Sequence, residues 1–296
     1  MPPCQFGERQ YELAANLELL ARSGSFFAPT TSLEAKLGID VALTPGDPRV
    51  WNLLGMQAPG GVGTAAGTPG GWPWPPMAQA SPPFLLSLFI QYKRSTYLTR
   101  STANEWHTHD EPYWRIELTA HQHKVLQSLE TAVGTTAAVR YAAPKFWQHR
   151  DMWRLQGTGA VMDNSLLVAP GDVQRRHTRL TWSSARGLVG HSDAEPLRAE
   201  TAADLGREIL ARAARGERSR EGMRQHLAAL STAVAELTPR QRSRDSWRED
   251  IAGREEYREL REAGELIEPL ADIATVAEAA HTARASWMIV AVAERP

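Results

Sequence analysis

Two short stretches of the chain place polar side chains where buried apolar strands are expected. Residues 38–43 carry Asp40, and residues 84–93 end with Gln91 and Lys93. A charged group in an apolar environment is costly unless it is paired or binds a metal. We therefore interpret the acid on the first strand and the amide and amine on the second as parts of one polar site.

The chemistry that these residue types predict is metal-dependent hydrolysis of a phosphodiester. We expect Asp40, Gln91 and the backbone carbonyl of Tyr92 to supply oxygen ligands for a hard cation, Mg²⁺ or Mn²⁺. The metal would polarise the scissile phosphate and lower the pKa of an attacking water. Because residues i and i+2 of a strand face the same side, Lys93 would point with Gln91 at the site and stabilise charge or orient the water.

The elements that must position these groups begin with a helix. Residues 8–21 have apolar side chains at helical spacing, and Gly24 is expected to end the helix. Glu8 and Glu12 are four residues apart and so share a face of it. We expect Glu12 to support the metal, with Glu8 as the second choice.

The other elements predict a mixed α/β arrangement. The apolar content of residues 84–92 is continuous, which is typical of a central strand covered on both faces. Residues from about 55 to 83 are rich in Gly and Pro, and we expect a flexible insertion without a periodic element there. Further strands are expected at residues 39–43, 113–118, 137–142, 165–168, 178–182 and 287–292, and helices at residues 32–37 and 121–130.

The composition changes after about residue 194, where Ala, Glu, Arg and Leu dominate. We therefore expect two domains. Residues 1–195 are predicted to form an α/β domain with a mixed central sheet flanked by helices, and residues 196–296 a mainly helical C-terminal domain. The helices of the second domain are expected at residues 199–215, 219–236, 248–263 and 270–284.

The order of these motifs resembles the PD-(D/E)XK nuclease superfamily. A helix glutamate is followed by Gly-Ile-Asp at residues 38–40 and by Gln-Tyr-Lys at residues 91–93, and this Gln variant is similar to that of Mrr-type restriction endonucleases. The resemblance implies a restriction-endonuclease-like fold, with cleavage of DNA in restriction or phage defence. A family of uncharacterised bacterial proteins is also similar over about residues 5–195, in the stretches 7–12, 34–40, 90–94, 121–123, 141–146 and 164–166.

The neutral amide of Gln91 departs from the usual acid of this superfamily. The site has one anion fewer, so we expect weaker binding of Mg²⁺. The alternative is a catalytically inactive nuclease-fold protein that binds nucleic acid or a protein partner in a defence system. Asp40 and Lys93 can also be explained without catalysis. Asp40 would then accept hydrogen bonds from backbone amides at a strand end, and the aliphatic part of Lys93 would cover apolar surface.

Basic and aromatic residues alternate between residues 140 and 154. Since the net charge of the chain is −1, any binding of nucleic acid must come from such a local patch. Cations that contact phosphates and aromatic rings that stack on bases suit this role, whereas a solvated connection with core aromatics is the alternative. The candidate contact residues are Arg140, Lys145, Arg150 and Arg154, interleaved with Phe146, Trp147 and Trp153.

Two pairs of histidines offer other chemistry. His107 and His109 have the spacing of a cupin metal motif, but Tyr113 stands where that motif has a glutamate, so we interpret them as incidental histidines of a surface loop. An enzyme acting on a small molecule through these histidines is a third hypothesis. His121 and His123 open a helix, where we expect capping or packing, with phosphate contact as the alternative.

The composition excludes several classes of protein. Apolar residues make up 42% and charged residues 23% of the 296 residues, as in an ordinary soluble globular protein. The single cysteine, Cys4, excludes an intramolecular disulfide, and no phosphate-loop or dinucleotide motif is present. Without a secretion signal or an apolar run of about 18 residues, we expect a cytoplasmic protein outside the membrane, with a homodimer or a defence-system protein as candidate assemblies.

Overall fold

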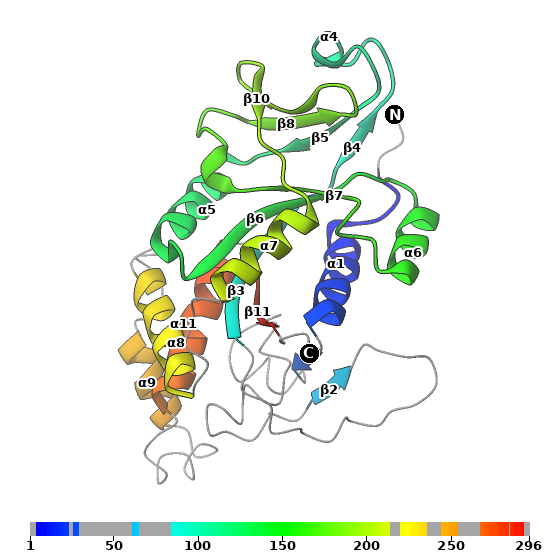
Figure 1. Cartoon of the computed structure of the whole chain (residues 1–296). Helices are drawn as coiled ribbons and strands as arrows, with labels where there is room; N and C mark the ends of the chain where they lie inside the picture. Colours follow the sequence, from blue (N-terminus) through cyan, green and yellow to red (C-terminus); the bar gives the residue numbers. More distant parts are fainter. Residues whose placement is uncertain are drawn as a thin grey trace. The chain divides into compact units, whose positions relative to one another are not determined.

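The computed structural model describes residues 4–23, 26–29, 61–64, 84–213, 220–235, 244–253, 267–283 and 285–292 (Figure 1). The chain is a mixed α/β protein that divides into two compact units, each assembled from separate stretches. Residues 1–19, 90–131 and 139–208 belong to the first unit, and residues 20–89, 132–138 and 209–296 to the second. The expected domain boundary between residues 195 and 196 stays a prediction.

Helix α1 (Glu8–Ser23) forms where the apolar spacing predicts it. The Tyr11 hydroxyl donates to Ser165 Oγ over 2.7 Å, and Glu18 Oε2 accepts the backbone N–H of Met162 over 3.1 Å. These bonds give partners to polar groups that the packing of the helix buries. The buried face of the helix, with a spacing of three and four residues, contains Tyr11, Ala14, Ala15 and Glu18.

A five-stranded antiparallel sheet in the first unit has the strand order β10-β9-β8-β5-β4. In its register Arg115 lies opposite Thr181 and Trp114 lies opposite Trp182. Because strand residues alternate between faces, Arg115 and Thr181 share one face and the two indoles the other. The strands are β4 (Thr96–Leu98), β5 (Tyr113–Glu117), β8 (Arg179–Ser183), β9 (Gly187–His191) and β10 (Glu195–Leu197).

A four-stranded sheet has the order β11-β3-β6-β7. Strand β3 has a neighbour on each side, which confirms the central position predicted from its continuous apolar sequence. Every residue of β6 is buried. The strands are β3 (Phe84–Tyr92), β6 (Ala137–Pro144), β7 (Ser165–Val168) and β11 (Ser286–Val292), with β6 and β7 antiparallel.

Helix α5 (Ala120–Val133) confirms a prediction, whereas helix α6 (His149–Thr158) was not expected. Helix α6 has only ten residues, of which Met152 and Leu155 are buried, so its apolar pattern is too brief to be read from the sequence. It ends at Gly159, whose φ of 64° favours a glycine. The short elements α4 (Trp106–His109) and η1 (Pro170–Asp172) lie in connections.

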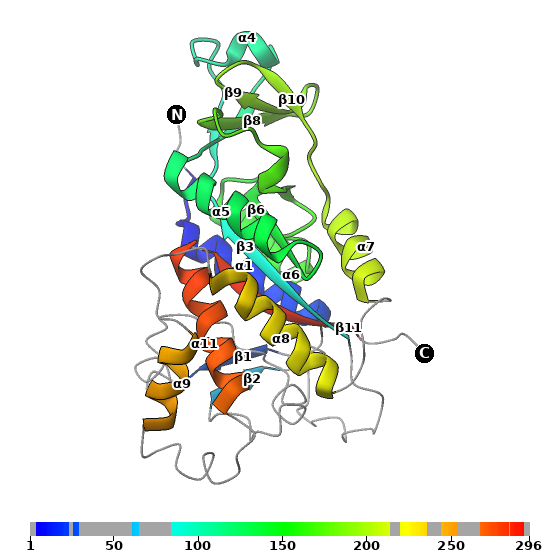
Figure 2. The ribbon, with the colours of Figure 1, turned by 90° about the vertical axis from the view of Figure 1, so that its left-hand side faces the viewer.

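The second unit contains three of the predicted C-terminal helices. Helix α11 (Ile267–Thr282) packs against α8 (Arg220–Ala235) and α9 (Arg244–Gly253), and the three lie side by side in both views (Figures 1 and 2). The Phe89 and Trp287 rings stack with centroids 6.3 Å apart. Helix α7 (Ala202–Ala213) precedes these three in the chain.

A two-stranded antiparallel sheet lies in the N-terminal part of the second unit. Strand β1 (Phe26–Pro29) pairs with β2 (Gly61–Thr64), so the prediction of no periodic element in residues 55–83 was wrong at β2. The expected helix at residues 32–37 and strand at residues 39–43 lie outside the described residues. Among the helices that the structure describes, none has the length and apolar character needed to cross a membrane.

Candidate active site

The candidate site is centred on the end of strand β3. Gln91 is 2% exposed, and its Oε1 atom has no hydrogen-bond partner among the described residues. Tyr92 is the last residue of the strand, and Lys93 follows it half-buried, with its backbone N–H donating to Ala142 O over 2.8 Å. The strand end is thereby held against β6, and alternation directs Gln91 and Lys93 to the same side.

The amine of Lys93 is bound by helix α5. Lys93 Nζ donates to Oε1 of Gln122, in the first turn of that helix, over 2.7 Å. The two residues come from separate stretches of the sequence, and their contact links the end of β3 to the beginning of α5. Gln122 was not among the predicted site residues.

His123, the next residue of α5, has a packing role, as the sequence predicts. It is 1% exposed, and burial lowers the pKa of its imidazole. Its Nε2 lies 3.0 Å from Val173 O, which can only accept, so Nε2 carries the proton. Its Nδ1 then accepts from the Tyr141 hydroxyl over 3.0 Å, and both ring nitrogens are occupied by protein groups.

Helix α1 approaches β3 at Tyr92. The Tyr92 hydroxyl donates to Asn16 Oδ1, and the Tyr11 ring lies edge-on to it with centroids 5.5 Å apart. Burial is the main cause that raises the pKa of Tyr92, followed by the neighbouring Tyr11, Glu12 and Glu18. Glu12, half-buried, therefore lies near the Tyr92 ring, on the side of the strand that alternation gives to Tyr92.

The donor set for a metal is incomplete within the described residues. Asp40 lies outside them, and no group of three His, Cys, Asp or Glu side chains that could hold a metal ion occurs among the residues that the structure describes. What the described residues offer is the buried amide oxygen of Gln91, whereas Glu12, expected to support the metal, lies with α1 on the opposite, Tyr92 side of the strand. An amide oxygen is a suitable ligand for Mg²⁺, but a site needs an anionic partner that Asp40 would have to supply.

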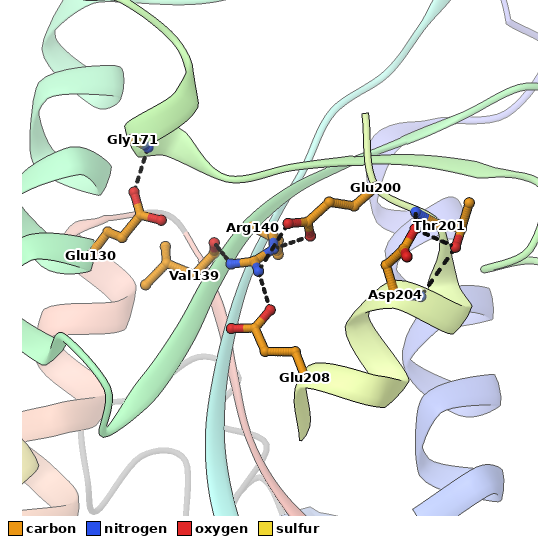
Figure 3. A network of polar contacts seen from close by, with 8 residues as sticks. All are labelled: Glu130, Val139, Arg140, Gly171, Glu200, Thr201, Asp204 and Glu208. Carbon is orange, nitrogen blue, oxygen red and sulfur yellow. Dashed lines mark hydrogen bonds and ion pairs between the residues drawn. The ribbon is translucent and has the colours of Figure 1, made fainter. Parts of the chain in front are cut away.

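Arg140, one of the expected nucleic-acid contacts, is a buried ion-pair residue instead (Figure 3). It is 5% exposed, and its Nε donates to Glu200 Oε2 over 2.6 Å while its Nη2 pairs with Glu208. Its Nη1 donates to Val139 O over 2.8 Å. Since every residue of β6 is buried, the charge of Arg140 requires such partners, and it is not presented to a ligand.

The other expected contacts lie at the surface. Lys145 is exposed just after β6, and Arg150 and Arg154 are exposed on α6. Trp153, between them, is 64% exposed, so it is not a core aromatic. Phe146 is buried, and its ring lies 5.4 Å from that of Phe6.

A buried cluster on the antiparallel sheet was missed by the sequence analysis. His109 is 2% exposed, so its interpretation as a surface-loop residue was wrong, whereas His107 is exposed. Thr181 Oγ1 lies 2.7 Å from His109 Nε2 and 2.6 Å from His191 Nε2. Side chains alternate between the two faces of β8 and β9, and this alternation can be read from the sequence. Only the pairing of the two strands, however, shows which of their residues share a face.

Glu105 anchors the connection that covers this polar face. The carboxylate is buried, accepts the Tyr113 hydroxyl over 2.9 Å and pairs with Arg179 over 2.8 Å. The His109 ring stacks on Tyr113 with centroids 4.8 Å apart. The cluster is thus held together by internal hydrogen bonds and ion pairs, although Arg179 Nε is buried without a hydrogen-bond partner among the described residues.

Comparison with known proteins adds no assignment. No family model matches the chain, and no significant match was found among the curated proteins or the solved structures. Any statement about function therefore rests on the residues at the end of β3 and on the surface residues of α6.

Proposed function

We propose that the chain is a metal-dependent nuclease with a restriction-endonuclease-like domain at residues 1–195 and a mainly helical C-terminal domain at residues 196–296. The substrate is DNA, the cation is Mg²⁺ or Mn²⁺, and the setting is restriction or phage defence in the cytoplasm. One observation carries the proposal: Oε1 of Gln91, in a central strand and two residues before Lys93, is buried without a hydrogen-bond partner among the described residues. A buried acceptor without a partner costs roughly 1–3 kcal/mol, which favours a ligand at that position.

Each residue at the strand end has a role in the proposed reaction. Gln91 and the Tyr92 carbonyl provide neutral oxygens, and Asp40 provides the anion that a hard cation requires. When bound, the cation polarises the phosphate and acidifies the attacking water. The Lys93 ammonium, held by Gln122, stabilises the charge that develops on the phosphate oxygens, whereas Glu12, on the Tyr92 side of the strand, has no role in the proposed reaction.

The direct test is a cleavage assay with the full chain, plasmid DNA and either Mg²⁺ or Mn²⁺. The Asp40→Asn and Lys93→Met variants should each lose cleavage by about 100-fold or more, because the first removes the anion that holds the cation and the second removes the charge that stabilises the phosphate oxygens. Lys124→Met is the matched control, since Lys124 is an exposed lysine of α5 outside the site. Equal cleavage by all four proteins would reject the proposed site.

The second candidate is a nuclease-fold protein without activity that binds nucleic acid or a protein partner in a defence system. The neutral Gln91 favours it, because the site has one anion fewer than the acid version and holds a cation less strongly. DNA binding in EDTA without turnover in Mg²⁺ or Mn²⁺ would support this candidate. A Gln91→Glu variant that begins to cleave DNA would then show that the missing anion is the cause.

A further inference from the structure

Helix α6 carries an indole that is exposed to solvent, although the opposite side of the helix is buried. Trp153 is 64% exposed, whereas Met152 and Leu155, on the opposite side, are 5% and 3% exposed. Among the described residues, the large apolar side chains that are exposed to this degree are Trp153 and Leu13, which is 56% exposed. A large exposed indole is uncommon unless it has a partner to stack on.

The indole lies within a basic stripe of the helix. Arg150, Trp153, Arg154 and Gly157 are separated by three and four residues, so they share one face of α6, and all four are exposed. Asp151 is half-buried and lies three residues before Arg154, at the edge of the stripe, so one carboxylate offsets part of its positive charge. No atom lies within 4 Å of the position that a Cβ of Gly157 would take, so the surface next to the indole is open.

The helix that carries the stripe is bonded to another segment at its beginning and is capped by its own carbonyl groups at its end. The backbone N–H of His149 donates to Gln5 Oε1 over 3.2 Å at its beginning, and Gly159 N–H bonds to Gln156 O and Leu155 O at its end. The His149 ring lies 5.6 Å from that of Trp153, at an interplanar angle of 31°, and limits its rotation. A rigid aromatic group loses little entropy when a ligand binds to it.

From this arrangement we infer that the Arg150–Trp153–Arg154 stripe binds single-stranded nucleic acid by stacking an unpaired base on the indole. Two guanidinium groups on the same face suit the phosphates on either side of that base. A base within a duplex is already stacked on both sides, so an isolated indole on a convex helix gains its contact only with an unpaired base. The inference rests on the proposed function for its choice of nucleic acid, but the binding does not require the metal.

The test measures binding and cleavage separately. Fluorescence anisotropy in EDTA measures the affinity of the full chain for three probes: a short oligo-dT, an abasic oligonucleotide of equal length and a duplex. We expect oligo-dT to bind more tightly than the other two probes, and Trp153→Ala to weaken its binding about 10-fold, as for the loss of one stacked base. Trp153→Phe should restore most of the affinity, and Arg150→Ala should lower the slope of log K against log salt by about one.

The matched control is Leu13→Ala, which removes the other exposed apolar side chain and should leave oligo-dT binding unchanged. Equal affinity of wild type and Trp153→Ala, or equal affinity for oligo-dT and the abasic probe, would overturn the inference. Binding of an acidic polypeptide alone, with no binding of oligo-dT, would overturn it as well. If Trp153 governs binding but no cleavage occurs in Mg²⁺ or Mn²⁺, the inference stands and the proposed nuclease fails. If cleavage depends on Lys93 and Trp153→Ala changes neither cleavage nor binding, the proposed nuclease stands and the inference about Trp153 fails.

Discussion

Lys93 and Gln122 form a hydrogen bond of 2.7 Å that joins the end of β3 to the first turn of α5. The lysine was selected from the sequence as a candidate catalytic residue, and the glutamine was not. A flexible four-carbon side chain acts in one place only when a neighbour limits its rotamers. The bond therefore identifies Gln122 as the residue that positions the amine.

The first prediction concerns this positioning. Gln122→Leu keeps the size of the side chain but removes the acceptor, so we expect kcat for DNA cleavage to fall about 10-fold, with little change in KM. His121→Ala, at the exposed neighbouring position, should leave both constants unchanged. Unchanged kcat in Gln122→Leu, with circular dichroism equal to that of wild type, would remove Gln122 from the mechanism.

The second prediction concerns the buried ion pairs of Arg140. Arg140→Met leaves two carboxylates, Glu200 and Glu208, without their shared cation, and breaking a buried pair in this way costs about 3 kcal/mol of unfolding free energy. Arg207→Met is the comparison, because Arg207 and its partner Asp204 form a more exposed pair worth at most about 1 kcal/mol. Urea denaturation measures both. Similar losses in the two variants would show that burial does not govern the strength of the Arg140 pairs.

The third prediction concerns acid stability. Burial lowers the pKa of His109, His123 and His191 in the folded protein, so the unfolded chain binds more protons than the folded one as the pH falls below the ordinary value of about 6.5. The stability that the neutral imidazoles provide is complete above that pH and is lost progressively below it, toward the lowered pKa values. We expect the melting temperature to fall between pH 7.5 and pH 5.5, a range chosen to bracket the ordinary histidine value.

The control for this effect replaces two of the buried rings. The double variant His109→Gln/His191→Gln has two fewer titrating groups, so its melting temperature should depend less steeply on pH than that of wild type. His107→Gln, which changes an exposed histidine, should retain the wild-type slope. A melting temperature that rises on acidification would contradict the direction of all three shifts.

The fourth prediction uses two glycines with opposite surroundings. A Cβ at Gly190 would lie 2.8 Å from the His177 ring and 2.9 Å from Leu197 Cδ1, so Gly190→Ala should destabilise the antiparallel sheet by about 1–3 kcal/mol through overpacking. Gly206, within helix α7, has no atom within 4 Å of its Cβ position, and Gly206→Ala should stabilise by about 0.5–1 kcal/mol. Thermal unfolding of both variants checks whether the signs differ.

Periodicity predicted the elements that have long apolar patterns. Helices α1 and α5 and strands β3, β6 and β7 lie close to their expected ranges, because burial of a continuous face leaves a repeated signal in the sequence. Helix α6 and strands β4, β9 and β10 were missed, since segments of three to ten residues are too short for a repeated apolar pattern.

The site was less predictable than the fold, because residue types do not reveal tertiary partners. The sequence placed Gln91 and Lys93 correctly at the end of β3, where alternation alone gives their common direction. Arg140 looked like a surface cation until its partners, 60 and 68 residues later, were seen to bury it. Asp40, on which the metal ligand set depends, lies outside the described residues and stays a prediction.

The position of Thr181 between His109 and His191 restricts the two imidazoles jointly. A threonine hydroxyl has one hydrogen to donate and two lone pairs that accept, so at most one of the two Nε2 atoms can be an acceptor from it and at least one must carry a proton. A state in which both rings lack the proton on Nε2 is therefore excluded, because one of the two contacts with Thr181 would then join two acceptors. If His109 carries its proton on Nδ1, His191 must keep a proton on Nε2, and the reverse also holds, so the end of helix α4 and strands β8 and β9 are coupled through one hydroxyl.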